Sequence, residues 1–574
     1  MSSSEFRYRF NAIGVQAKSA KKQKKQNLIQ NIRGNSGESI TKSCSNHNGP
    51  SCPVTRSSQS TKNITVIAET SSLRLRDCAE CKTGPLDLSK VKDSIQRDPT
   101  YLHVICQKCG HINNVNLQET DNNDKEERRG RKINPLARRA VLGCLHQGLG
   151  HSQYEGLMAS MNIKAMSENT FKRAEREVGV MIEETSKESC DKWRKKEKRR
   201  GKGVGMKASY DAGWQKQGRA HNSRTGQGTM VGLQTGKCID YGTKNAYCRK
   251  CVEAEKRGAD PKPHDCRLNH VGSAKAMESS IAIEICQKDQ YQVLIGDDDS
   301  TVISRLRAEV NSNLEKWSDI NHATCTLTKA LYEGRGRNFG PDNDRLNEHV
   351  IDHVKTCFTY ALHQNKNNIS GIVEGIKAIV PHSFGDHTNC GQWCRQRKDP
   401  EAYRHSTLPS GRDLRGDGLK HFLNDVLQPF TTEEVVKKLA PLGSTQRNEC
   451  INGIVGTKNP KKRFYGGSES SDYRVSAAVA QFNEGYQYLK TVEEKMGCAE
   501  EETLNAYITR MQRKRKQCTE RKQKRSSKRR RKELKGKRKN KQKKCEKKEG
   551  TTYSSGNLYI KLSSCKRIFN NILV

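Results

Sequence analysis

The stretch VGMKASYDAGW, residues 204–214, alternates small or apolar side chains with polar ones, which predicts a β-strand carrying Asp211 near its middle. Two further strand-like runs follow, GTMVGLQTG at 228–236 and KCIDYGT at 237–243, divided by glycine and polar turns. A fourth run, YQVLIGDDDS at 291–300, is apolar and ends in acids. Amphipathic helical patterns come after it. Strands in succession, then another strand and helices, predict an α/β fold.

The charge balance indicates a polyanionic partner. Lys and Arg number 105 against 64 Asp and Glu, a net charge of +41, and nucleic acid is the first choice. No apolar run approaches the roughly 20 residues of a membrane span. The opening MSSSEFRYRFNAIG lacks the apolar region of a signal peptide. We therefore expect no membrane partner, and a reducing compartment in which paired cysteines indicate metal sites before disulfides.

Composition divides the chain into segments. Residues 71–118 contain two C-x-x-C pairs, and 130–198 are helical, with Gly breaks and basic residues that fit a helix-turn-helix-like DNA-binding region or a plain helical linker. The predicted organisation is a disordered segment 1–70, a zinc-ribbon-like module 71–118, a helical region 130–198, an α/β domain 200–500, a basic disordered tail 505–550 and an unassigned tail 551–574.

Several acidic residues lie in or next to predicted strands, where they could form a metal site for phosphodiester chemistry. Such chemistry favours divalent metals held by carboxylates on rigid strand ends. Asp211 lies in the first strand, Asp297 directly follows the fourth, and Asp299 lies on the same side by period two. Glu449 falls near the first turn of a predicted capped helix. A solvated surface carboxylate is the ordinary alternative for any one of these acids. Mg²⁺ or Mn²⁺ would be the expected ion, because both prefer oxygen ligands.

Cysteine and histidine form three groups with the spacing of structural Zn²⁺ sites. The first is two C-x-x-C pairs, the second offers five candidates for four positions, and the third falls within thirteen residues. Incidental Cys and His in loops are the alternative for the second and third. The candidates are Cys78, Cys81, Cys106 and Cys109; Cys248, Cys251, His264, Cys266 and His270; and His382, His387, Cys390 and Cys394.

Several motifs together resemble one family. SYDAGWQKQGRAHNSRTGQGTMVGLQTGK, the C-x-x-C, H-D-C-x-x-N and GSAKAMES that follow, and IGDDDS are similar to Mutator-like element (MULE) transposases of the metazoan type. So are KWSDINHATCTLTKAL, with its D-x-x-H arrangement, and STQRNECINGIVGTKNPKKRFYGGSESSDYRVSAAVAQFNEGY. The resemblance runs from about residue 72 to 490.

The resemblance implies a nuclear DDE transposase with an RNase H-like core, a zinc-binding insert at about 246–272 and a mostly helical insertion at about 325–440. Such an enzyme cuts transposon ends and joins the 3′-OH to target double-stranded DNA. The family motifs assign Asp211, Asp297 and Glu449 as the triad. Asp299 is the substitute for Asp297. Further accessory and ligand residues follow from the same motifs: Asp319, His322, Cys248, Cys251, His264 and Cys266, with His270 in reserve.

Other readings remain open. A domesticated or decayed transposase would act as a non-enzymatic, zinc-containing DNA-binding protein, and a nuclease acting on RNA–DNA hybrids would share the core. Transposases commonly work as multimers, so a homo-oligomer is expected. The basic run KRRRK predicts a nuclear-localisation signal and DNA contact, with a solvated charge run as the alternative. Its residues are Lys528, Arg529, Arg530, Arg531 and Lys532.

Overall fold

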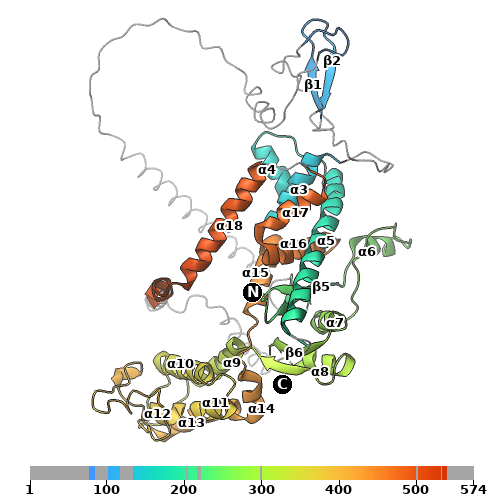
Figure 1. The fold of residues 1–574 in the computed structure, drawn as a ribbon. Coiled ribbons are helices and arrows are strands. Elements are labelled where there is room, and N and C mark those ends of the chain that lie inside the picture. Colours follow the sequence, from blue (N-terminus) through green and yellow to red (C-terminus); the bar gives the residue numbers. More distant parts are fainter. Residues whose placement is uncertain are drawn as a thin grey trace, which may run out of the picture. The chain divides into compact units, whose positions relative to one another are not determined.

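A five-stranded mixed sheet forms the centre of the computed structural model, with the strand order β5-β4-β3-β6-β7 (Figure 1). The three strands that are consecutive in sequence pair antiparallel, and β6 and β7 add in parallel on the other side of β3. This confirms the α/β class. The strands are β3 Met206–Trp214, β4 Thr225–Gly232, β5 Cys238–Asn245, β6 Tyr291–Gly296 and β7 Glu315–Ser318. The structure describes residues 77–84, 101–116, 133–201, 205–215, 222–297, 300–498, 502–531, 533–534 and 536–538.

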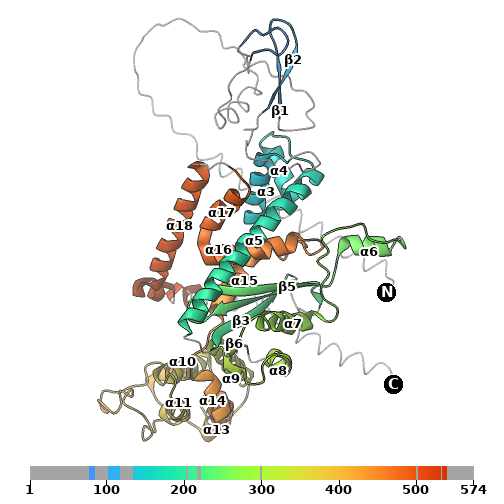
Figure 2. The same ribbon diagram turned by 45° about the vertical axis from the view of Figure 1, so that its right-hand side comes forward.

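Both faces of the sheet are covered. On β4, Met230 belongs to a buried cluster with α7 (Ala274–Cys286). The next residue, Val231, belongs to a second cluster with α15 (Gln446–Lys458) and α16 (Ser470–Glu484). This is the period-two alternation of a strand with two buried faces. Figure 2 shows the long helix α5 and the shorter α7 at different sides of the strands. No described helix is long and apolar enough to cross a membrane.

The N-terminal and C-terminal helices share one core. Helices α3 (Pro135–Gln147), α4 (His151–Ser160) and α5 (Glu168–Arg200) confirm the predicted helical segment, and the Ser167 side chain caps α5. Their buried residues, among them Leu145, Phe171 and Ile182, form one cluster with residues of the C-terminal helices. Those helices are α16 Ser470–Glu484, α17 Tyr488–Lys495 and α18 Glu502–Gln523.

The chain after residue 505 differs from the predicted disordered tail, since α18 is helical and helix continues in the described residues to 538. Ile508 is buried in the shared core and Tyr507 packs against it. The Arg515 guanidinium donates to the carbonyls of Gln481 and Phe482 at the end of α16. Apolar residues in its first turns and basic capping of a neighbouring helix therefore order this segment. Residues 1–70 and 551–574 lie outside the described part.

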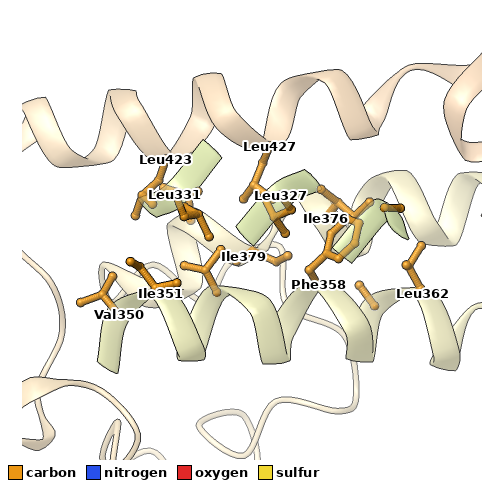
Figure 3. Close-up of a cluster of buried hydrophobic side chains, with 14 of the residues drawn as sticks. Leu327, Leu331, Val350, Ile351, Phe358, Leu362, Ile376, Ile379, Leu423 and Leu427 are labelled. Atoms are coloured by element: carbon orange, nitrogen blue, oxygen red, sulfur yellow. The ribbon is translucent and has the colours of Figure 1, made fainter. Parts of the chain in front are cut away.

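The segment between β7 and α15 is helical, as the sequence predicted, and has its own core. Figure 3 shows Leu327, Phe358 and Leu423 from three of its helices pointing into one cluster of buried side chains. α9 begins directly after β7, and α14 contacts β7, so both ends of the insertion return to the sheet. The helices are α9 Ile320–Glu333, α10 Glu348–Gln364, α11 Ile369–Lys377, α12 Ile379–Ser383, α13 Asp417–Leu427 and α14 Glu433–Leu439.

Candidate active site and metal centres

The parallel pairing of β3 and β6 brings two of the candidate acids side by side. Ser209 pairs with Ile295, and two residues further along each strand stand Asp211 and Asp297. Side chains two residues apart lie on the same face of a strand. The two carboxylates therefore meet at one edge of the sheet, where β6 ends.

His322 and Glu449 complete this group. His322 lies in the first turn of α9, and its Nδ1 is 2.6 Å from Oδ1 of Asp297. Its Nε2 is 3.9 Å from Oε1 of Glu449 on α15 (Gln446–Lys458). The Asp297, Glu449 and His322 side chains are 42, 52 and 40% exposed, so the site is open to a large substrate.

The neighbouring acids change the pKa of Asp211. Burial, and then the negative charges of Asp297 and Glu449, raise the pKa of Asp211 to about 7, partly opposed by a backbone hydrogen bond and His322. Like charges gathered this closely destabilise one another unless a proton or a cation lies between them. The donor set, carboxylate oxygens with one imidazole, suits a hard divalent cation such as Mg²⁺ or Mn²⁺.

Two asparagines on α15 hold this helix against the sheet. Asn448 is fully buried, accepts a 2.6 Å hydrogen bond from the Ser209 hydroxyl, and donates to the Thr229 carbonyl at 2.7 Å. One turn later, Asn452 Nδ2 donates to Asp211 Oδ2 at 2.8 Å. Neither residue was predicted from the sequence. Asn448 and Asn452 are four residues apart and flank Glu449, so all three lie close together on one helix. This spacing is the sequence signal that could have identified them.

Asp319 does not point at the other acids. It is fully buried, caps α9 through the backbone N–H of Asn321 at 2.6 Å, and accepts hydrogen bonds from Thr445. It therefore ties α9 to the start of α15 rather than adding a carboxylate to the open site. Of the two alternatives for the second acid, Asp297 is the described one; Asp299 lies outside the described residues.

The first Cys group closes a small hairpin, β1 (Tyr101–Ile105) and β2 (Ile112–Asn116). The Sγ atoms of Cys78 and Cys109 are 3.5 Å apart, and those of Cys81 and Cys106 are 3.6 Å apart. All four lie within 4.8 Å of one another and could hold a metal ion. Four thiolates at such distances suit tetrahedral Zn²⁺.

The second group gathers four of its five candidates beside α6 (Arg249–Glu255). His264 Nε2 is 3.2 Å from Cys248 Sγ and 3.5 Å from Cys251 Sγ, and Cys266 Sγ is 3.5 Å from Cys251 Sγ. His264 Nδ1 lies 2.7 Å from the Lys262 carbonyl, which leaves Nε2 free to act as the ligand atom. His270 stands apart from the group: its Nε2 lies 3.1 Å from the Ser273 carbonyl.

The third group is assembled at the end of α12. Nδ1 of His382 and Nδ1 of His387 are 3.0 Å apart, with Cys390 Sγ 3.4 Å from the first and Cys394 Sγ 3.5 Å from the second. Tyr403 Oη lies 3.2 Å from the outer Nε2 of His382, an arrangement that orients a ligand imidazole. These four residues could hold a third metal ion.

The basic run is helical where it is described. Residues 528–531 continue the helical segment after α18 and are exposed. Lys532 lies outside the described residues. Contact with a polyanion requires only such solvent-exposed cations.

Comparison with known proteins agrees with these features. A family model described as "Mutator-like transposase" matches residues 59–394. The matched span contains Asp211, Asp297, His322 and all three Cys/His groups, whereas Glu449 lies beyond it. No curated protein matches the chain.

Proposed function

Because this chain belongs to the Mutator-like transposase family, we propose that it is a DDE-type DNA transposase that cleaves transposon ends and joins their 3′-OH groups to target DNA. The single observation that carries the proposal is the meeting of Asp211, Asp297 and Glu449 around His322 at one open edge of the sheet. These acids come from sequence positions up to 238 residues apart, and the fold brings them together.

The topology supports an RNase H-like core. Three antiparallel strands are followed by two that extend the sheet in parallel beside β3, with the helical insertion between β7 and the helix that carries Glu449. Acids on two adjacent central strands, with a third from a helix packed on the sheet, provide the rigid support that a metal site requires.

The chemistry assigns a role to each residue. A bound divalent metal pair would activate the attacking water or 3′-OH and stabilise the leaving oxygen. Asp211, Asp297 and Glu449 would hold the cations. His322, whose Nδ1 lies 2.6 Å from Asp297 Oδ1, would fix the orientation of that carboxylate, and Asn452, which donates a hydrogen bond to Asp211, would do the same for Asp211. The half-exposed edge leaves room for a duplex.

The proposal is tested with a DNA substrate that carries the terminal inverted repeats of the element around this gene. The full-length protein should cut this DNA with Mg²⁺ or Mn²⁺, and Asp211→Asn or Glu449→Gln should lower the rate by at least about 100-fold, because each removes a metal ligand. Glu434→Gln, an exposed carboxylate on α14, is the matched control and should cut normally. Asp297→Asn compared with Asp299→Asn decides which acid is the second ligand.

The outcomes separate the competing functions. Cleavage that survives Asp211→Asn and Glu449→Gln would overturn the assigned site. Repeat-specific binding without cleavage by the wild type would indicate a domesticated, non-enzymatic DNA-binding protein. Preferential cutting of RNA–DNA hybrids would indicate a nuclease instead.

The partners and the setting follow from the same proposal. Zinc in the three Cys/His groups would stabilise the small hairpin, the α6 insert and the helical insertion. The basic run KRRRK at 528–532 would direct the protein to the nucleus, and pairing of two transposon ends would call for a homo-oligomer.

A further inference from the structure

A pocket of about 390 Å³ lies on the flank of the helix that carries Glu449. Its wall on α15 includes Cys450, which directly follows Glu449, and Gly453, which directly follows Asn452. One residue turns about 100° around a helix. The lining residues of the pocket therefore lie on the side of α15 next to the face that supports the carboxylate site.

The other walls are aromatic and amide-bearing. Tyr486, from the 3-10 turn η5 (Gly485–Gln487), and Tyr507, from α18, are half-buried, with ring centroids 5.9 Å apart and planes at 84°. Gln147 and Gln481 add side-chain amides. Aromatic faces stack on any base, and amides can pair with its polar edge.

Two exposed cations lie beside this pocket, on α18. Arg510 stands three positions after the pocket residue Tyr507, and Lys514 stands three positions after the pocket residue Met511. Both cations are exposed. Residues three apart are neighbours on a helix surface. The Arg510 guanidinium lies 5.8 Å from the Tyr507 ring centroid. The phosphates on either side of a base seated in the pocket would meet these cations.

We propose that this pocket takes one unpaired nucleobase, extruded from the DNA strand next to the bond that the carboxylate site cuts. The inference rests on the proposed function for its location, and on the pocket itself for its ligand. Two aromatic rings, two side-chain amides and the nearby cations match the face of a base, its polar edge and the phosphates beside it.

Gly453 offers a direct way to close the pocket. A Cβ at this position would meet no heavy atom within 4 Å, so Gly453→Phe puts a ring into the pocket without a clash at its root. Gly453→Ala is the matched control, because it removes the same helix glycine and leaves the space open. The probe is a fluorescein-labelled duplex with one bulged thymine, compared with the fully paired duplex, at constant salt and without divalent cations.

Wild type and Gly453→Ala should bind the bulged duplex about tenfold more tightly than the paired one, the order expected for one stacked base. Gly453→Phe should bind both equally. Loss of the preference in Tyr507→Ala but not in Tyr507→Phe is the second test, should Gly453→Phe fail to fold in a thermal melt. No preference in the wild type, or an undiminished one in both Gly453→Phe and Tyr507→Ala, overturns the inference.

This readout needs no cleavage. Asp211→Asn should retain the preference while losing cleavage. Preference without any cleavage by the wild type would overturn the proposed transposase activity alone, and carboxylate-dependent cleavage without preference would overturn the pocket alone.

Discussion

Asp319 and Thr445, 126 residues apart, are joined by two hydrogen bonds: the Asp319 carboxylate accepts one from the Thr445 backbone N–H at 2.8 Å and another from its hydroxyl. Beside them, the Ile320 N–H donates to the carbonyl of Gly443 at 3.2 Å. A Cβ at Gly443 would lie 2.8 Å from the Ile295 side chain and 3.1 Å from the Ser318 carbonyl, so a larger residue would force the two segments apart. This junction closes the helical insertion and fixes the start of α15, the helix that carries Glu449 and packs against β3 and β4.

Asp319→Asn should weaken the junction, because both carboxylate oxygens accept hydrogen bonds and an amide offers only one acceptor oxygen. Hydrogen bonds to a buried charge contribute about 1.5–3 kcal/mol each, so we expect a lower melting temperature and reduced cleavage. Asn347→Ala is the control. It removes the cap of α10, a loss of about 1 kcal/mol, far from the carboxylates, and should leave cleavage unchanged. Normal cleavage by Asp319→Asn would contradict the positioning role.

Asn452→Ala should leave Asp211 without its side-chain donor. The carboxylate would then be less well oriented, and we expect cleavage to need a higher Mg²⁺ concentration, with a midpoint raised about 10-fold. DNA binding without cations should not change. A fall in the maximal rate at an unchanged Mg²⁺ midpoint would show that Asn452 does not act through the metal ligand.

Zinc content should be three ions per chain, measured by mass spectrometry of the metal in purified protein. Cys251→Ser and Cys394→Ser should each lower it by one, because each removes one thiolate of a four-ligand set. Cys325→Ser, an exposed cysteine on α9 outside these groups, should have no effect. His270→Ala should also keep all three ions, and loss of one would return His270 to the ligand set.

Lys458 should make stability depend on alkaline pH. Burial, and then the charge of Arg474, lower the pKa of Lys458 to about 7. The unfolded chain keeps the ordinary value near 10.4, so between these values it binds more protons than the folded chain, and stability rises with pH. From pH 7.5 to 9.5 this contributes roughly 2.7 kcal/mol, or on the order of 5 °C in melting temperature.

Lys458→Met should flatten this rise, whereas Lys437→Met, at an exposed position of α14, should preserve it. A rise of equal size in the Lys458→Met variant would mean that the pH dependence comes from other groups.

Local features were predictable because they depend on neighbours in sequence. Alternating and apolar runs predicted β3 to β6, and the spacing of Cys and His predicted the three Cys/His groups, since neighbouring ligands need only a short stretch of chain. β7 (EKWS) escaped prediction because it has four residues and a half-exposed pattern. The helix α18 was also not predicted. Its apolar residues Leu504, Tyr507 and Ile508 stand among many charges, and they stabilise a helix only because the neighbouring helices provide a core for them to pack against.

The carboxylates show the same division. Family-like motifs in the sequence led to the prediction of Asp211, Asp297 and Glu449, because each sits in a recognisable local setting. The pairing of Asp211 with Asp297 depends on the register of β3 against β6, and the burial of Asp319 depends on Thr445 far along the chain. Strand register and long-range hydrogen bonds arise from packing between distant segments. For that reason the candidate acids could be proposed from their surroundings in the chain, whereas the tertiary structure decided which of them lie together and which is buried.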